Sequence, residues 1–134
     1  MRGNGKRNRD VSWRNATTYD LEERESHMPG IAVVALAGEL NLTNAHELAE
    51  RLDDVVPPHG LVVDLNRLAF VDSAGLDRLF LLARERGHGR IAFVVEKTAP
   101  IATTLDTVGL VRAAILVPSV EEAFGALAAA SPAR

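Results

Sequence analysis

The chain contains no cysteine and no long apolar run, and each of these absences excludes a class of protein. Without cysteine there can be no disulfide, no thiolate zinc site and no thiol nucleophile. The longest unbroken apolar run covers residues 31–37, seven residues, whereas a membrane-spanning helix needs about 20. Residues 1–14 are polar and lack the apolar core of a signal peptide. We therefore expect a cytoplasmic protein with no membrane segment.

Aromatic residues are also scarce, at 4% of the chain, so the core must be built from Leu, Val, Ile and Ala. The apolar fraction of 47% is too high for a wholly disordered chain. A length of 134 residues suits one domain with a sizeable core.

Charge is distributed unevenly along the chain. Residues 1–14 carry five cationic side chains against Asp10 alone, a net charge of +4. Because the whole chain carries −3, the remaining 120 residues carry −7. The basic residues are separated by Gly and Asn without periodicity, so we predict a disordered basic tail over residues 1–12 and a single domain over residues 13–130. Two roles for the tail stay open: weak contact with nucleic acid or an acidic partner, or none.

Short apolar β-branched runs alternate with helical patterns along the rest of the chain. Strands are predicted at residues 13–19, 31–37, 61–65, 91–95 and 115–117, with a charged loop over residues 20–30. Helices are predicted after an N-cap at Thr43 or Asn44, around residues 76–83 ending at Gly87, from Pro100, and after the capping box of Ser119 and Glu122. This order predicts an α/β fold: a mixed, mostly parallel sheet of about four to five strands with about four helices, its first two strands forming an antiparallel hairpin.

The most informative segment is Asp72-Ser73-Ala74-Gly75, where a buried strand leads directly into a helix. A helix N-terminus presents unpaired N–H groups and the positive end of the helix dipole. A serine there can act as an N-cap or a simple turn residue. It can also accept a phosphate, whose charge of about −1.5 to −2 the helix end tolerates but a partner docked on the same surface does not. Both interpretations stay open from the residues alone.

Four ordered motifs give the chain a resemblance to the STAS domain family of sulphate transporters and anti-sigma factor antagonists. They are Gly38-Glu39-Leu40 with Thr43-Asn44-Ala45, then Val63-Asp64-Leu65 and Phe70-Val71 before Asp72-Ser73-Ala74-Gly75-Leu76, and at the C-terminal end Val108-Gly109-Leu110 with Ser119-Val120-Glu121-Glu122-Ala123. The resemblance covers residues 30–128, nearly all of the predicted domain.

The resemblance implies a bacterial anti-sigma factor antagonist that regulates sigma-factor-dependent transcription. Such a protein binds an anti-sigma factor with serine kinase activity and is released when that kinase phosphorylates the motif serine, here Ser73. It implies no cofactor of its own, because ATP belongs to the kinase, and no direct DNA binding; a serine phosphatase is a further expected partner. By motif position, the partner-binding residues are Asn41, Asp72, Ser73, Ala74, Gly75, Leu76 and Leu79.

The chain departs from the family pattern in two places. Asn41 stands where many members carry Asp in the turn near the acceptor, which keeps the hydrogen bonding but removes a charge. The segment before the third helix reads Lys97-Thr98-Ala99-Pro100, and Thr103 and Thr104 follow it where members often carry basic residues. These departures bear on which kinase the chain would meet.

The remaining candidates favour structural roles over catalysis. The four histidines are scattered and predict surface positions rather than a metal site: His27, His46, His59 and His88. Asp64 is expected to end its strand and Asp72 to support the turn before the helix. Glu47 and Arg51 form a predicted i,i+4 surface pair. Since no Ser-His-Asp arrangement or phosphate loop is present, we expect no enzyme.

Two further alternatives stay open. The helix residues Leu79 to Leu82 exceed one apolar stripe, which predicts either an exposed patch beside Ser73 or burial under a neighbouring loop. The function could also be that of a non-switching STAS scaffold or sensor module in a larger signalling assembly, in which Ser73 only caps its helix.

Overall fold

The computed structural model describes residues 19–54, 60–87, 89–108 and 115–130. Within these ranges the strands are β1 (Tyr19–Arg24), β2 (Ile31–Leu40), β3 (Gly60–Val71), β4 (Ile91–Val94) and β5 (Ile115–Val117). The helices are α1 (Ala45–Asp54), α2 (Ser73–Arg86), α3 (Ala102–Val108) and α4 (Val120–Ala130). The prediction of a basic tail over residues 1–12 lies outside the described residues.

The strands form one mixed sheet in the order β1-β2-β3-β4-β5. β1 pairs antiparallel with β2, and the other three pairings are parallel. This confirms the predicted α/β class, with its N-terminal hairpin and mostly parallel sheet.

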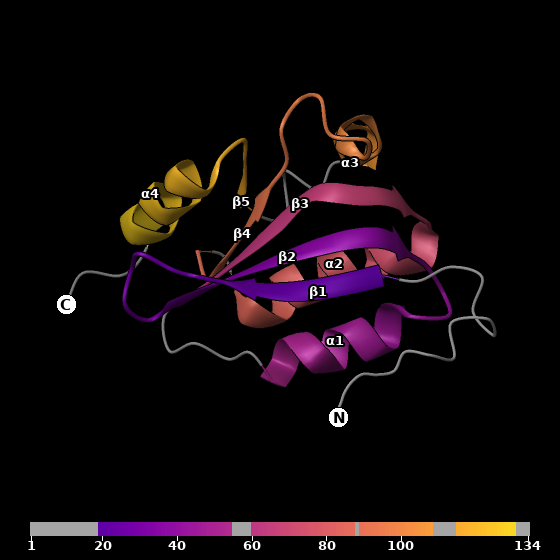
Figure 1. Ribbon diagram of the computed structural model, residues 1–134, viewed down its shortest axis with the longest axis horizontal. Coiled ribbons are helices and arrows are strands. Elements are labelled where there is room, and N and C mark those ends of the chain that lie inside the picture. The colour runs from indigo at the N-terminus through magenta and orange to yellow at the C-terminus, as the bar shows by residue number, and fades with distance from the viewer. Residues whose placement is uncertain (1–18, 55–59, 88, 109–114, 131–134) are drawn as a thin grey trace.

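Two apolar layers cover the two faces of this sheet, because the central strands carry apolar side chains on both faces. On one face α1, α2 and α3 pack on a cluster that includes Leu36, Val63 and Phe93. On the other face α4 packs on Ile31, Val62 and neighbouring residues. Figure 1 shows α1 and α2 on one side of the sheet and α4 on the other. Both faces are buried, which accounts for the near-continuous apolar runs in the sequence.

Helix boundaries follow the expected capping chemistry. α2 ends at Gly87, whose φ of 92° lies in the left-handed region that favours glycine. Before α4, the Ser119 hydroxyl accepts a hydrogen bond from the Glu122 N–H at 3.1 Å. α3 begins at Ala102, two residues after the predicted start at Pro100. None of the described helices is long and apolar enough to cross a membrane.

Three predictions of strand bounds are wrong. The strand predicted over 31–37 runs on to Leu40. The charged stretch from Asp20 to Arg24 is part of strand β1, not a loop. An edge strand has a neighbouring strand on one side only. Charged side chains that face solvent are tolerated on such a strand, and they discourage pairing with other chains and aggregation. The predicted strand over 61–65 runs on to Val71, because its later residues pair with the end of β2 after pairing with β4 has stopped at Asp64. The predicted strand residues 13–18 lie outside the described residues.

Candidate functional site

The site is built where the carboxyl ends of β2 and β3 meet. Leu40 and Val71 are register partners at the ends of these parallel strands, and the Asp72 N–H donates to the Leu40 carbonyl at 3.1 Å. The loop after β2 and the start of α2 are therefore side by side. In open α/β sheets, ligand sites lie at this end of the strands.

Asp72 is the N-cap of α2 and ties the two segments together. One carboxylate oxygen accepts from the Gly75 N–H at 2.9 Å, and the other accepts from the Leu42 N–H at 3.2 Å. The expectation that Asp72 supports the turn is confirmed. Because Asp72 takes the capping position, the interpretation of Ser73 as an N-cap is wrong.

Ser73 is the first residue of α2 and is exposed. Among the described residues, none forms a hydrogen bond with its hydroxyl group. The hydroxyl therefore stands at the positive end of a helix of 14 residues and is exposed to solvent. Ala74, which follows it, is half-buried.

Gly75 is required by a close approach of two backbones. A Cβ atom at this position would lie 2.8 Å from the Leu40 carbonyl oxygen and 2.7 Å from a methyl carbon of Val71. The absence of a side chain lets the first turn of α2 sit directly on the end of β2. This packing fixes the position of Ser73 relative to the ends of β2 and β3.

The loop after β2 is ordered by two asparagines. The Asn41 side-chain oxygen accepts from the Thr43 N–H at 2.9 Å and from the Thr43 hydroxyl at 2.6 Å, an Asx turn that an aspartate could also form. Asn44 is buried, accepts from the Asn41 N–H at 2.9 Å and donates to the Glu39 carbonyl at 2.9 Å. Asn44 also takes the N-cap position just before α1, since its carbonyl accepts from the Leu48 N–H.

Three of the predicted partner-binding residues lie beneath the surface. Gly75 is buried, Leu76 is 9% exposed and Leu79 is 1% exposed. The side chains of Leu76 and Leu79 pack in the apolar cluster beneath α2, and Gly75 has no side chain. Of the alternatives for Leu79 to Leu82, burial holds for Leu79 and Leu82, while Phe80 and Leu81 are half-buried.

Sequence reasoning missed the exposed apolar residues of this end of the molecule. Leu42 is 78% exposed in the loop held by Asp72, and Phe70, two positions before Asp72, is 50% exposed. The available signal was an apolar side chain between the polar residues Asn41 and Thr43. We use the term Ser73 surface for the exposed or half-exposed residues Leu42, Asp72 and Ser73, in which Asp72 bonds to the Leu42 N–H.

Other predicted residues take structural positions. Asp64 lies within β3 rather than at its end, and one of its oxygens accepts from the Asn66 N–H at 2.9 Å. His27 and His46 are exposed, as predicted, whereas His59 and His88 lie outside the described residues. No group of three or more His, Asp or Glu residues that could hold a metal occurs among the described residues.

Glu47 and Arg51 meet through Tyr19 instead of forming the predicted direct pair. The Tyr19 hydroxyl donates to Glu47 at 3.1 Å and accepts from Arg51 at 3.2 Å, and the Arg51 guanidinium lies 5.4 Å from the ring centre. Burial raises the pKa of Tyr19 to about 12. This contact fastens edge strand β1 to α1.

Comparisons with known proteins agree with this arrangement. A family model described as "Mlab, STAS domain" matches residues 24–118. Anti-sigma-F factor antagonist RsfB of Mycobacterium tuberculosis, matched in two strains, is 29% identical over 97 residues, which cover 71% of this chain and 80% of that protein.

Two solved structures share the fold. The crystal structure of an anti-sigma factor antagonist from Mycobacterium paratuberculosis has a TM-score of 0.71 at 24% identity and covers 83% of this chain and 95% of that one. The murine Slc26a9 anion transporter has a TM-score of 0.66 at 15% identity, over 89% of this chain but 24% of that one.

Proposed function

This chain belongs to the STAS domain family, and we propose that it acts as an anti-sigma factor antagonist whose binding is controlled at Ser73. In this proposal the unphosphorylated chain binds an anti-sigma factor with serine kinase activity and so frees a sigma factor. Phosphorylation of Ser73 by that kinase ends the complex, and a phosphatase restores it. The name of the mycobacterial relative supports the antagonist role.

The observation that carries the proposal is the free Ser73 hydroxyl at an exposed helix start. Asp72 caps α2, so Ser73 is not needed for capping and its oxygen is available as a nucleophile. In the transfer, the Ser73 oxygen would bond the γ-phosphorus of ATP, ADP would leave, and the hydroxyl proton would pass to a base of the kinase. ATP and that base belong to the partner, and this chain supplies only the acceptor.

Phosphorylation would act on binding through charge at the Ser73 surface. The phosphate would add about −1.5 to −2 charges beside the carboxylate of Asp72. Leu42, whose N–H bonds to Asp72, offers exposed apolar area close by, and apolar area stabilises a complex only when water leaves it. A dianion at the same surface resists that loss of water, so the complex weakens while the fold is kept.

A phosphate-transfer assay tests the acceptor. The purified chain is incubated with ATP and each serine-kinase anti-sigma factor of its source organism, and the modified residue is located by tandem mass spectrometry. We expect one kinase to place phosphate on Ser73 stoichiometrically and to place none on Ser73→Ala. Equal phosphorylation of Ser73→Ala would show that the acceptor is assigned wrongly.

A further inference from the structure

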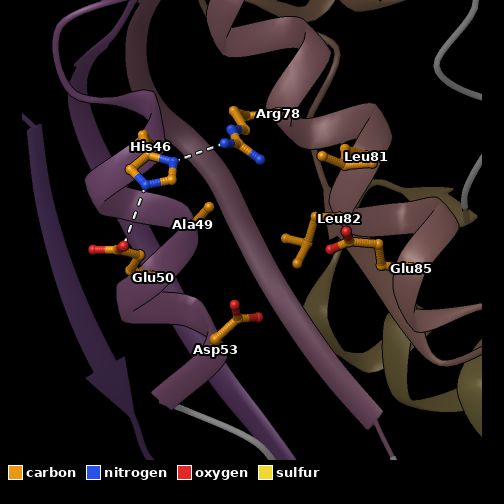
Figure 2. Close-up of a pocket in the computed structure, with 8 residues that line it drawn as sticks. All are labelled: His46, Ala49, Glu50, Asp53, Arg78, Leu81, Leu82 and Glu85. Carbon is orange, nitrogen blue, oxygen red and sulfur yellow. Dashed lines mark hydrogen bonds and ion pairs between the residues drawn. The ribbon is translucent and has the colours of Figure 1, made fainter.

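A groove lies between α1 and α2 (Figure 2). It is on the face of the sheet opposite α4. Ala49, Leu81 and Leu82 give it an apolar lining, and three acidic residues border it: Glu50, Asp53 and Glu85. An apolar lining with carboxylates at its rim suits a long cationic side chain, because the methylene stem can be buried while the head group stays at the rim.

One end of the groove is closed by a chain of hydrogen bonds. Arg78 Nη2 lies 2.7 Å from His46 Nδ1, and His46 Nε2 lies 3.2 Å from a carboxylate oxygen of Glu50. Arginine only donates, so Nδ1 is the acceptor and the ring proton on Nε2 points to Glu50. Arg78 and Glu50 are therefore occupied at this end.

The other two carboxylates have no such partner. Asp53 extends from α1 and Glu85 from α2, on the two walls of the groove (Figure 2). Among the described residues, none forms a hydrogen bond or ion pair with either carboxylate. Two unpaired negative charges on facing walls favour a cation between them.

The basic N-terminal segment is the occupant that this chain itself provides. Residues 2–14 carry a net charge of +4, and the rest of the chain carries −7. β1 begins at Tyr19, whose hydroxyl contacts Glu47 and Arg51 on α1, so the described part of the chain begins beside this helix. Ten extended residues span up to about 33 Å, whereas a helix with side chains is about 10–12 Å wide. The segment can therefore reach around α1.

We propose that residues 2–14 dock in the α1–α2 groove. A basic side chain lays its stem on Ala49 and Leu81 and places its head group between Asp53 and Glu85. The contact is intramolecular and electrostatic, so it weakens as salt rises. It does not depend on Ser73, so this proposal and the proposed phosphorylation can fail separately.

Paramagnetic relaxation in the full-length chain tests the docking. The chain has no cysteine, so Asn8→Cys gives a single attachment site for a nitroxide label. We expect selective broadening of the backbone amide signals of Asp53 and Glu85 at low salt. The broadening should disappear at about 1 M salt, where the Debye length falls to about 3 Å. Absence of broadening at low salt would overturn the proposal.

Charge variants and a mixing experiment supply the controls. Asp53→Lys with Glu85→Lys should abolish the broadening, whereas Glu96→Lys with Glu121→Lys, the same charge change at exposed positions outside the groove, should leave it. Persistence in the Asp53/Glu85 variant would overturn the assigned groove. Broadening of isotope-labelled chains by added spin-labelled chains would show docking between two copies and contradict the intramolecular contact. Unchanged dispersion of the amide spectrum verifies that each variant is folded.

Discussion

Single residues set how closely α2 approaches the sheet, and Gly75 is the tightest case. We expect Gly75→Ala to destabilise the fold by about 1–3 kcal/mol, because its Cβ would overlap the Leu40 carbonyl and Val71. Gly125→Ala is the matched control, since nothing lies within 4 Å of that Cβ and alanine favours a helix interior by up to about 1 kcal/mol. Urea unfolding of both variants measures the difference; equal midpoints would contradict the close approach.

The Tyr19 side chain makes the stability of the folded chain depend on pH. Its pKa is about 12 in the folded chain against 10.0 unperturbed, chiefly because burial disfavours the phenolate. The folded state therefore holds the proton more tightly, and the stability this contributes is complete below pH 10 and is lost as pH rises towards 12.

Tyr19→Phe removes that titration. We expect the free energy of unfolding of Tyr19→Phe to fall less steeply between pH 10 and 12 than that of the unmodified chain. Denaturant unfolding at intervals across this range measures both slopes. Parallel curves would show that the phenol does not couple to folding.

Two elements, the loop after β2 and the start of α2, are joined by one carboxylate. Asp72→Ala leaves the Leu42 and Gly75 N–H groups without their acceptor, and we expect a loss of about 1–2 kcal/mol, typical of an N-cap. Asp72→Asn keeps only one acceptor oxygen, so its free energy of unfolding should lie between those of Asp72→Ala and the unmodified chain.

Amide hydrogen exchange tests the contact between Asp72 and Leu42 by itself. We expect the Leu42 amide to exchange faster in Asp72→Ala, because that amide loses its acceptor. The Asn44 side chain, which holds the base of the loop, is unchanged and limits the effect to the tip. Unaltered exchange at Leu42 would mean that Asp72 does not hold the loop.

The strands and helices differ in how well the sequence alone predicts them. Buried strands and capped helices followed from apolar runs and from local signals such as Gly87 and Ser119. Strand β1 was hidden because an edge strand of charged residues carries no apolar pattern. The length of β3 was hidden because its second half is fixed by pairing with β2 and not by its own pattern.

The candidate site divides in the same way. The motif fixed the positions of Asp72 and Ser73, since both lie within one short segment. The contact of Asp72 with Leu42, the burial of Leu79 and the exposure of Leu42 depend on how α2 packs on two strands. Such tertiary contacts join residues about 30 positions apart, which no local pattern reports.

Across the whole molecule, the exposed residues that we expect to bind the partner are distinct from the buried residues that stabilise the packing of α2. We expect Leu42→Ser to weaken binding of the cognate anti-sigma factor while leaving stability unchanged, because this side chain is 78% exposed. We expect Leu79→Ala to cost about 2–5 kcal/mol of stability, because that side chain is buried. Thermal unfolding and titration calorimetry on both variants measure the two effects. Reduced stability in Leu42→Ser would contradict this division.

The central claim is that charge at Ser73 controls binding of an anti-sigma factor. The most direct measurement is the dissociation constant, by titration calorimetry, of the anti-sigma factor that phosphorylates the chain. Unmodified chain and Ser73→Ala should bind alike, and Ser73→Asp should bind at least about tenfold more weakly, or about 1.4 kcal/mol. Ala128→Asp, the same added charge at an exposed position of α4, should bind like the unmodified chain. Equal affinity of Ser73→Asp and unmodified chain would contradict the claim and favour a non-switching STAS module.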